Sequence, residues 1–166
     1  MRLIITGTPG TGKTVLAKAI AARTNSIHID VNQLITKNKS FTKRKGVREK
    51  IVDLKALRRL LLPLLKRKDV VLDSHLLCEI PLPCDSVIVL RCDPRVLKKR
   101  LAARKYNKKK LNENLLCEYL DYCLVRSLEN YAAKKVVQID NTKPLTPAKI
   151  MAQRTAKVNW IKGREK

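Results

Sequence analysis

The feature that most constrains this chain is a glycine-rich turn placed directly after a short apolar run. Gly7–Thr14 reads GTPGTGKT and satisfies the pattern G-x-x-x-x-G-K-[ST] at each fixed position, right after Leu3–Ile5. Good helix formers follow in Val15–Arg23, so the context is strand, turn and helix. In such a context the turn directs main-chain N–H groups at phosphates, Lys13 reaches the β- and γ-phosphates, and Thr14 holds Mg²⁺. The alternative is a glycine-rich turn without a ligand.

The rest of the sequence alternates between short apolar runs and segments with helical periodicity. We expect strands at Leu3–Thr6, Ile27–Val31, Val70–Asp73, Ser86–Arg91 and Val136–Ile139. We expect helices at Lys13–Arg23, from Asp53 to the neighbourhood of Pro63, at Pro94–Arg104, at about Asn112–Tyr131, and from Thr146 toward Trp160. Strands that alternate with helices form a parallel sheet covered on both faces. The expected fold class is therefore α/β, with a five-stranded parallel sheet in a single domain over residues 1–166.

The balance of charges points to an anionic partner. The chain carries 37 lysine and arginine residues against 14 acidic residues, a formal net charge of +23. This excess is larger than solubility or a nucleotide pocket requires, and it predicts attraction to a polyanion, with RNA as the leading candidate. A lysine-rich proteome is the alternative source of the charge. Many of the cations lie in Asn32–Lys50, which we expect to be a mobile, solvated segment outside the core.

Cysteine spacing and the length of apolar runs indicate the cellular compartment in which the chain is expected. The five cysteines, at positions 78, 84, 92, 117 and 123, include no C-x-x-C pair. Their odd number and spacing favour reduced thiols over a zinc site. No apolar run approaches the length of a membrane span, and Met1-Arg2 leads straight into the first expected strand. We therefore expect a soluble, cytoplasmic protein without a membrane partner.

Polar residues at strand ends supply further candidates. Asp73 ends an apolar strand, where a carboxylate beside a phosphate-binding turn holds Mg²⁺ or, alternatively, only caps a turn. His75, two residues later, either orients a water molecule or the acceptor, or caps the loop. His28 shows no sign of a function and is expected to be a packed histidine. Asp140–Thr142 follows the last strand, where it either contacts adenine or forms a turn.

Two arginines suggest a lid. Arg100 and Arg104 are four residues apart, so they share a helix face before the short basic loop Tyr106–Lys110. This arrangement suits a flap that closes over ATP and places guanidinium groups on the transferred phosphate. A solvated basic helix face is the alternative. Arg91, at a strand end, is a weaker candidate of the same kind.

Several of these segments together resemble one known family. Its motifs are matched by GTPGTGKT at 7–14, Asp73-Ser74-His75, Arg104-Lys105-Tyr106-Asn107 and Lys109-Lys110-Leu111, with Asn114, Glu118 and Thr142-Lys143-Pro144 in register. From Met1 to about Trp160 the chain resembles the adenylate kinase isoenzyme 6 family. The resemblance implies a P-loop nucleoside monophosphate kinase fold with a short lid, and adenylate kinase and ATPase activities that use ATP and Mg²⁺. It also implies a role in maturing small-subunit ribosomal RNA, in contact with RNA or a small-subunit ribosomal protein.

The resemblance and the residue pattern together assign the site. ATP is expected at Gly10, Thr11, Gly12, Lys13, Thr14, Val15, Arg100 and Arg104. The expected catalytic residues are Lys13, Asp73, His75 and Arg104, and the expected magnesium ligands are Thr14 and Asp73. The monophosphate-binding segment would be about 30–53 and the lid about 103–113. In the family an arginine follows the second strand and a glycine follows the lid arginine, where this chain has Thr36-Lys37 and Lys105.

Three functions remain open at this point. The first is an ATP:AMP phosphotransferase, with AMP or another nucleoside monophosphate as acceptor. The second is an ATPase switch in ribosome assembly, in which the basic monophosphate segment contacts RNA and true monophosphate kinase activity is small. The third is a small-metabolite kinase of the same fold, which ranks last because no anion clamp for such a metabolite is identifiable.

Overall fold

The computed structural model of this chain describes residues 1–38, 41–43, 50–67, 69–104, 106–146 and 149. Its centre is a sheet made of β1 (Arg2–Thr6), β2 (Ile27–Asp30), β5 (Val70–Asp73), β6 (Ser86–Arg91) and β7 (Val136–Asp140). These strands lie in the order β2-β5-β1-β6-β7, and every neighbouring pair is parallel. The predicted α/β class with a five-stranded parallel sheet is therefore confirmed.

Helices and short turns connect the strands. The helices of the described residues are α1 (Lys13–Arg23), α2 (Val31–Lys37), α3 (Leu54–Leu61), α4 (Pro94–Ala103), α5 (Lys108–Tyr119) and α6 (Tyr122–Asn130). Single 3₁₀ turns are η1 (Leu64–Lys66), η2 (His75–Glu79) and η3 (Ala133–Lys135), and β3 (Phe41–Lys43) pairs antiparallel with β4 (Lys50–Val52). The prediction for α1 is confirmed to the residue. α3 ends two residues before Pro63, as expected for a helix that meets a proline.

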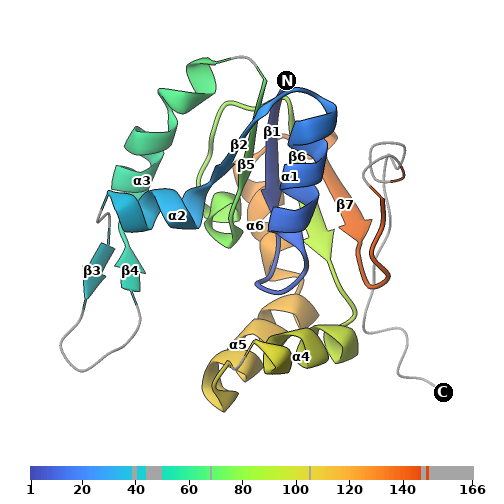
Figure 1. Cartoon of the computed structure of the whole chain (residues 1–166). Helices are drawn as coiled ribbons and strands as arrows, with labels where there is room; N and C mark the ends of the chain where they lie inside the picture. Colours follow the sequence, from blue (N-terminus) through green and yellow to red (C-terminus); the bar gives the residue numbers. More distant parts are fainter. Residues whose placement is uncertain (39–40, 44–49, 68, 105, 147–148, 150–166) are drawn as a thin grey trace.

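Alternate residues of the central strand β1 supply the two cores that hold the helices on the sheet. Leu3 and Ile5 are buried with apolar residues of α1 on one face. Ile4, whose side chain points the other way, is buried with residues of α3 and α6 on the opposite face. Figure 1 shows α1 and α6 on opposite sides of the sheet. The sheet is thus covered on both faces, which is why its strands read as continuous apolar runs.

The prediction of a solvated segment outside the core is wrong for the first part of Asn32–Lys50. The Asp30 carboxylate accepts a hydrogen bond from the Asn32 N–H at 2.9 Å and so caps α2. Val31 and Ile35 on this helix are 0% and 4% exposed and belong to the core. The many basic side chains of this segment suggest a solvated loop, although its first residues form a short helix with one apolar face. Residues 39–40 and 44–49 lie outside the described part of the chain.

The prediction of a single helix over Asn112–Tyr131 is also wrong, because the helical conformation is interrupted at Asp121. This residue has φ of +55°, in the left-handed region, and separates α5 from α6. Its carboxylate accepts a hydrogen bond from the guanidinium of Arg91, which holds the break in place. At the other end, Asn107 accepts from the Lys110 N–H at 2.8 Å and starts α5 earlier than predicted.

Three remaining expectations concern thiols, membranes and the last helix. The cysteines at 78, 84, 92, 117 and 123 are all free thiols. Within the described ranges, no helix combines the length and the apolar character that crossing a bilayer requires. The helix predicted from Thr146 toward Trp160 falls almost entirely on residues 147–148 and 150–166, outside the described residues.

Candidate active site

The glycine-rich turn leaves β1 at the carboxyl edge of the sheet and faces the α4–α5 pair (Figure 1). Gly7, Gly10 and Gly12 have φ of +136°, +93° and +102°, conformations that residues with side chains rarely adopt. A Cβ atom on Gly7 would lie 2.3 Å from the carbonyl oxygen of Leu90, and one on Gly12 only 2.7 Å from Nδ2 of Asn141. The backbone therefore requires glycine here, and successive main-chain groups can line the concave side of the turn.

Lys13 is the cation of this turn. Its Nζ donates hydrogen bonds to the carbonyl oxygens of Gly7 at 2.8 Å and Thr8 at 3.0 Å. The residue is 8% exposed, and burial lowers its pKa to about 8, while nearby acidic groups such as Asp73 act in the opposite direction. A positive charge that is already desolvated is well prepared to stabilise a phosphate group, because little water must leave when the ligand arrives.

Thr14 and Asp73 meet below the turn. The Thr14 hydroxyl donates to Oδ2 of Asp73 at 2.7 Å, although the two residues lie on α1 and β5. Nε2 of His28, on β2, lies 2.6 Å from the other carboxylate oxygen. One hydroxyl and one carboxylate fit Mg²⁺, which binds few protein oxygens and completes its shell with water and substrate phosphates. No larger cluster of histidine, cysteine and acidic side chains suited to a metal occurs among the described residues.

A cavity of about 350 Å³ opens above this pair. It brings together most of the residues predicted from the sequence: Gly10, Gly12, Lys13, Thr14, Val15, Asp73, His75 and Arg104. Asn32, Tyr106, Lys110 and Asn114 line it as well. The cavity is therefore built from the turn, from the end of β5 with the start of η2, from α2 and from the α4–α5 region, an arrangement that can surround a phosphate chain.

His75 lines this cavity in an uncharged form. Burial, together with the nearby positive charges of Lys13 and Lys110, lowers the pKa of this imidazole to about 4. At neutral pH the imidazole therefore offers one donor and one acceptor nitrogen, with no cation. Such a group can orient a water molecule or a substrate hydroxyl.

A second cavity, of about 430 Å³, lies on the other side of the turn. Apolar side chains such as Val15, Leu16 and Leu145 line it together with Arg104. Arg100 also lines it, but its guanidinium donates to the carbonyl oxygens of Asn141 at 3.0 Å and Thr142 at 2.9 Å. In this structure Arg100 therefore supports the wall of the apolar cavity.

The loop after β7 closes against the glycine-rich turn. Nδ2 of Asn141 donates to the Thr11 carbonyl oxygen at 2.8 Å. The Asp140 carboxylate accepts from the Thr142 N–H at 2.8 Å, which makes the segment a turn. The Thr11 side chain is buried and donates to the carbonyl oxygen of Thr8 at 2.9 Å, so its hydroxyl braces the loop. Of the two alternatives for Asp140–Thr142, the turn is therefore present, and Asn141 within it also lines the apolar cavity.

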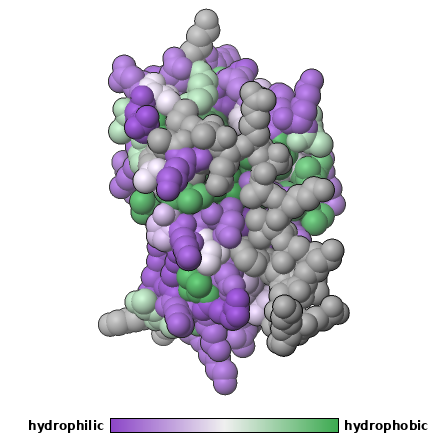
Figure 2. Space-filling model, turned by 90° about the vertical axis from the view of Figure 1, so that its right-hand side faces the viewer, coloured by the Kyte–Doolittle hydropathy of each residue, from purple (hydrophilic) through white to green (hydrophobic). Residues whose placement is uncertain are grey.

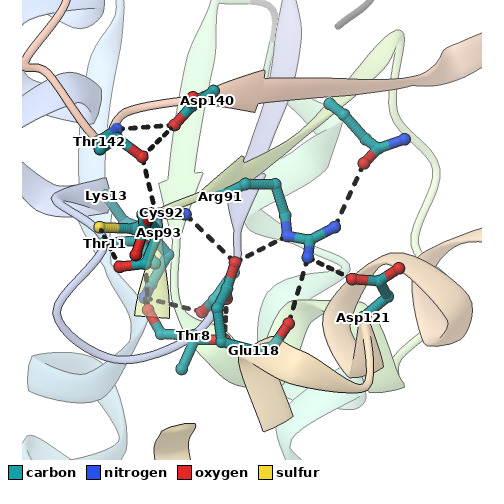
Figure 3. A network of polar contacts seen from close by, with 12 residues as sticks. Thr8, Thr11, Lys13, Arg91, Cys92, Asp93, Glu118, Asp121, Asp140 and Thr142 are labelled. Atoms are coloured by element: carbon teal, nitrogen blue, oxygen red, sulfur yellow. Dashed lines mark hydrogen bonds and ion pairs between the residues drawn. The ribbon is translucent and has the colours of Figure 1, made fainter. Parts of the chain in front are cut away.

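A buried carboxylate ties the glycine-rich turn to α5. Glu118 accepts hydrogen bonds from the Thr8 hydroxyl at 2.5 Å, from Nε of Arg91 at 2.8 Å and from the Cys92 N–H at 3.1 Å. Figure 3 shows these partners converging on Glu118, with Asp121 on the far side of the Arg91 guanidinium. Arg91 and Glu118 are each 2% exposed in their side chains. Arg91, predicted as a weak lid candidate, is thus a structural cation within the fold.

Three side chains around the site have partners that the sequence does not indicate. His28, for which the sequence shows no function, contacts Asp73, and Glu118, which the sequence marks only through the family resemblance, accepts from Thr8. Lys110, within the expected lid, lines the cavity. A signal existed for Lys110, because it lies six residues beyond Arg104 on the segment expected to form a lid. No local pattern marks His28 or Glu118, whose partners lie far away in the sequence.

The chain has clear relatives. Residues 3–121 match the family described as "AAA domain". The protein called "Putative adenylate kinase" of Methanocaldococcus jannaschii is 37% identical over 144 residues, which cover 86% of this chain and 77% of that protein. The proteins of the same name in Thermococcus onnurineus and Methanosarcina barkeri are 35% and 36% identical. Each match covers 86% of this chain, with 76% and 78% of the relative.

Solved structures agree on the fold. Shikimate kinase from Bacteroides thetaiotaomicron superposes with a TM-score of 0.57 at 19% identity, over 92% of this chain and 93% of that one. A gluconokinase from Sinorhizobium meliloti 1021 gives a TM-score of 0.58 at 16% identity, over 91% and 87%. At such identities the likeness shows the architecture alone. The matched family and the archaeal relatives go further, and the chain belongs to the AAA-domain family of P-loop kinases as a homologue of these adenylate kinase-like proteins.

Proposed function

We propose that this protein is an ATP:AMP phosphotransferase that uses Mg²⁺, in the manner of an adenylate kinase. The observation that carries the proposal is the contact between Thr14 and Asp73 within a cavity that His75, Arg104 and Lys110 also line. Phosphoryl transfer needs a metal site, cations around the transferred group and little covalent help. The archaeal relatives called "Putative adenylate kinase" support the same class of reaction.

The residues divide the work as follows. The main chain from Gly10 to Val15 holds the ATP phosphates, and the Lys13 ammonium neutralises charge on the transferred group. Thr14 and Asp73 hold Mg²⁺, which when bound neutralises the phosphate oxygens and aligns them. Arg104 lies at the end of α4 and reaches both cavities, so it suits a lid arginine on ATP. The apolar cavity beside the turn suits the adenine ring.

Two further segments complete the proposed site. The monophosphate segment, about 30–53, comprises α2 and the β3–β4 hairpin, which project beside the sheet in Figure 1. The lid, about 103–113, runs from the end of α4 into the first half of α5. Lys37, at the end of α2, is the cation nearest in sequence to the family's arginine position. Because lysine lacks the bidentate geometry of arginine, we expect it to bind the AMP phosphate less specifically.

The proposal is tested by the dependence of ADP formation on AMP. With ATP and AMP together, ADP is expected to form faster than with ATP alone, because AMP supplies an acceptor that competes with water. A coupled assay measures both rates on the same preparation, and CMP in place of AMP tests the choice of acceptor. An equal rate with and without AMP would contradict the phosphotransferase and leave an ATPase.

We also propose an ATPase activity in which His75 positions the attacking water. Replacing His75 with alanine is expected to lower the rate of ATP hydrolysis by about 100-fold, the lower end for a lost general acid–base group. Affinity for Mg·ATP is expected to change little, because the phosphates contact the turn and Lys13. Single-turnover hydrolysis and calorimetry measure the two quantities separately. Unchanged hydrolysis would return His75 to a structural role in η2.

A second candidate function is an ATPase switch that contacts RNA or a ribosomal protein during small-subunit maturation. The observation that favours it is the net charge of +23, which far exceeds what one nucleotide site uses. Figure 2 shows hydrophilic side chains over much of the coloured part of the face that it presents. The same coupled assay separates the candidates when RNA is added. If AMP adds nothing while RNA stimulates turnover, and salt abolishes the stimulation, the switch is the better description.

A further inference from the structure

The carboxylate of Asp73 has a second partner that the proposed function does not use. Nε2 of His28 lies 2.6 Å from Oδ1 of Asp73, whereas the Thr14 hydroxyl donates to Oδ2 at 2.7 Å. The side chain of His28 is 16% exposed and that of Asp73 is 1% exposed, so water competes weakly for this contact. Each carboxylate oxygen therefore has its own protein partner, one from β2 and one from α1.

The register of the sheet explains how the two side chains meet. β2 and β5 pair in parallel, with His28 opposite Val71 and Asp30 opposite Asp73. Val71 and Asp73 are two residues apart, so they share a face of the sheet, and Val71 is buried against α1 on that face. His28 reaches along the same face toward Asp73. The imidazole therefore lies on the side of the sheet that carries Thr14.

The chemistry of His28, Asp73 and Thr14 decides which group donates and which accepts in each hydrogen bond. An ionised carboxylate only accepts hydrogen bonds, so a neutral His28 carries its proton on Nε2; this tautomer is assigned from the partner. Thr14 gives its single hydroxyl proton to the same carboxylate, which leaves the lone pairs of its oxygen for a metal ion. Two partners on two oxygens fix the plane of the Asp73 carboxylate before any ligand binds.

We propose that His28 is a positioning residue for the metal site, an inference that rests on the proposed Mg·ATP function. It holds the carboxylate of Asp73 in the orientation in which Thr14 and Asp73 can share one divalent cation. Partners of this kind orient metal ligands, and their loss typically lowers metal affinity by about 10–100-fold. A histidine that only filled space would have no such effect on the metal once its volume was replaced.

The test measures how strongly the metal promotes ATP binding. Calorimetry gives the dissociation constant of ATP in EDTA and again in saturating Mn²⁺. The constant in EDTA divided by the constant in Mn²⁺ reports how strongly the metal promotes binding. We expect His28→Phe, which keeps a ring without a donor, to lower this ratio by about 10–100-fold while the constant in EDTA stays as in the wild type. His28→Gln, which retains an amide donor, is expected to recover most of the wild-type ratio.

The possible outcomes separate this inference from the proposed function. If the wild-type protein binds no ATP with metal present, the proposed function fails, whatever the variants do. If the wild type shows a large ratio and His28→Phe shows the same one, the positioning role is overturned. Equal losses in His28→Phe and His28→Gln would also overturn it, because the effect would then not depend on a hydrogen-bond donor. Thermal melting of each variant verifies that the compared proteins are folded.

Discussion

Replacing Lys13 with alanine is expected to abolish measurable ATP turnover, a loss of about 3 kcal/mol or more of transition-state stabilisation. The ammonium of Lys13 is buried and hydrogen-bonded to the carbonyl oxygens of Gly7 and Thr8, so its charge is held at the glycine-rich turn. Removing it takes away one of the cations that would neutralise the charge developing on the transferred phosphate. Turnover measured as ADP release with ATP, with and without AMP, checks this result.

The matched control is Lys18→Ala. Lys18 lies on the same helix but is exposed, so its replacement removes one charge from α1 without changing the glycine-rich turn. Turnover should therefore stay near the wild-type rate. The wild-type pH profile offers an independent check. Because the pKa of Lys13 is lowered to about 8, the free enzyme loses this charge above that value, and kcat/KM should fall as pH rises through about 8. Equal turnover in Lys13→Ala and Lys18→Ala would overturn the assignment of the site.

Removing the Glu118 side chain is expected to destabilise the fold by about 3–5 kcal/mol. The carboxylate is almost fully buried and pairs with the equally buried guanidinium of Arg91, so its removal leaves that cation without its buried counter-charge. The Thr8 hydroxyl and the Cys92 N–H lose their acceptor at the same time. Asp121 still contacts Arg91 and limits the damage. Urea unfolding of Glu118→Ala and the wild type measures the difference.

Glu113→Ala is the control for this change. Glu113 lies on α5 like Glu118, but its side chain is exposed. The ion pair that it forms with the exposed ammonium of Lys109 has the long distance of 4.0 Å. Exposed pairs of this kind contribute little, so its unfolding midpoint should match the wild type. A Glu118→Ala protein as stable as Glu113→Ala would show that the buried pair is dispensable. The network of Figure 3 would then have no part in holding the turn.

The elements that the sequence predicts well are those decided by local signals. β5 and β6 have the predicted bounds because each is a short apolar run between turn residues. α4 starts at Pro94 because Asp93 caps it, accepting from the Arg95 N–H at 2.7 Å. The glycine-rich turn carries its own geometry, so the tight turn at Gly7–Gly12 and the start of α1 at Lys13 could be predicted without any structure.

What the sequence does not predict depends on distant contacts. The apolar spacing of Leu116, Leu120 and Leu124 continues across Asp121 as it would in one helix, and the break there is held by Arg91, 30 residues away. His28 contacts Asp73 across 45 residues of sequence, and Thr8 contacts Glu118 across 110. These pairings exist only once the sheet has assembled, so no local pattern could reveal them.

The same long separations decide when the phosphate-binding turn takes shape during synthesis. β1 pairs with β5 and β6, which are synthesised much later. The Thr11 carbonyl oxygen gains its hydrogen-bond donor only once Asn141, 130 residues further on, has been synthesised. At roughly 5–20 residues per second, the turn is made on the order of ten seconds before the side chain that closes against it. A nascent chain that ends before Asn141 lacks the contact that closes against the glycine-rich turn. On the proposed function, nucleotide is therefore expected to stabilise only chains that extend past Asn141.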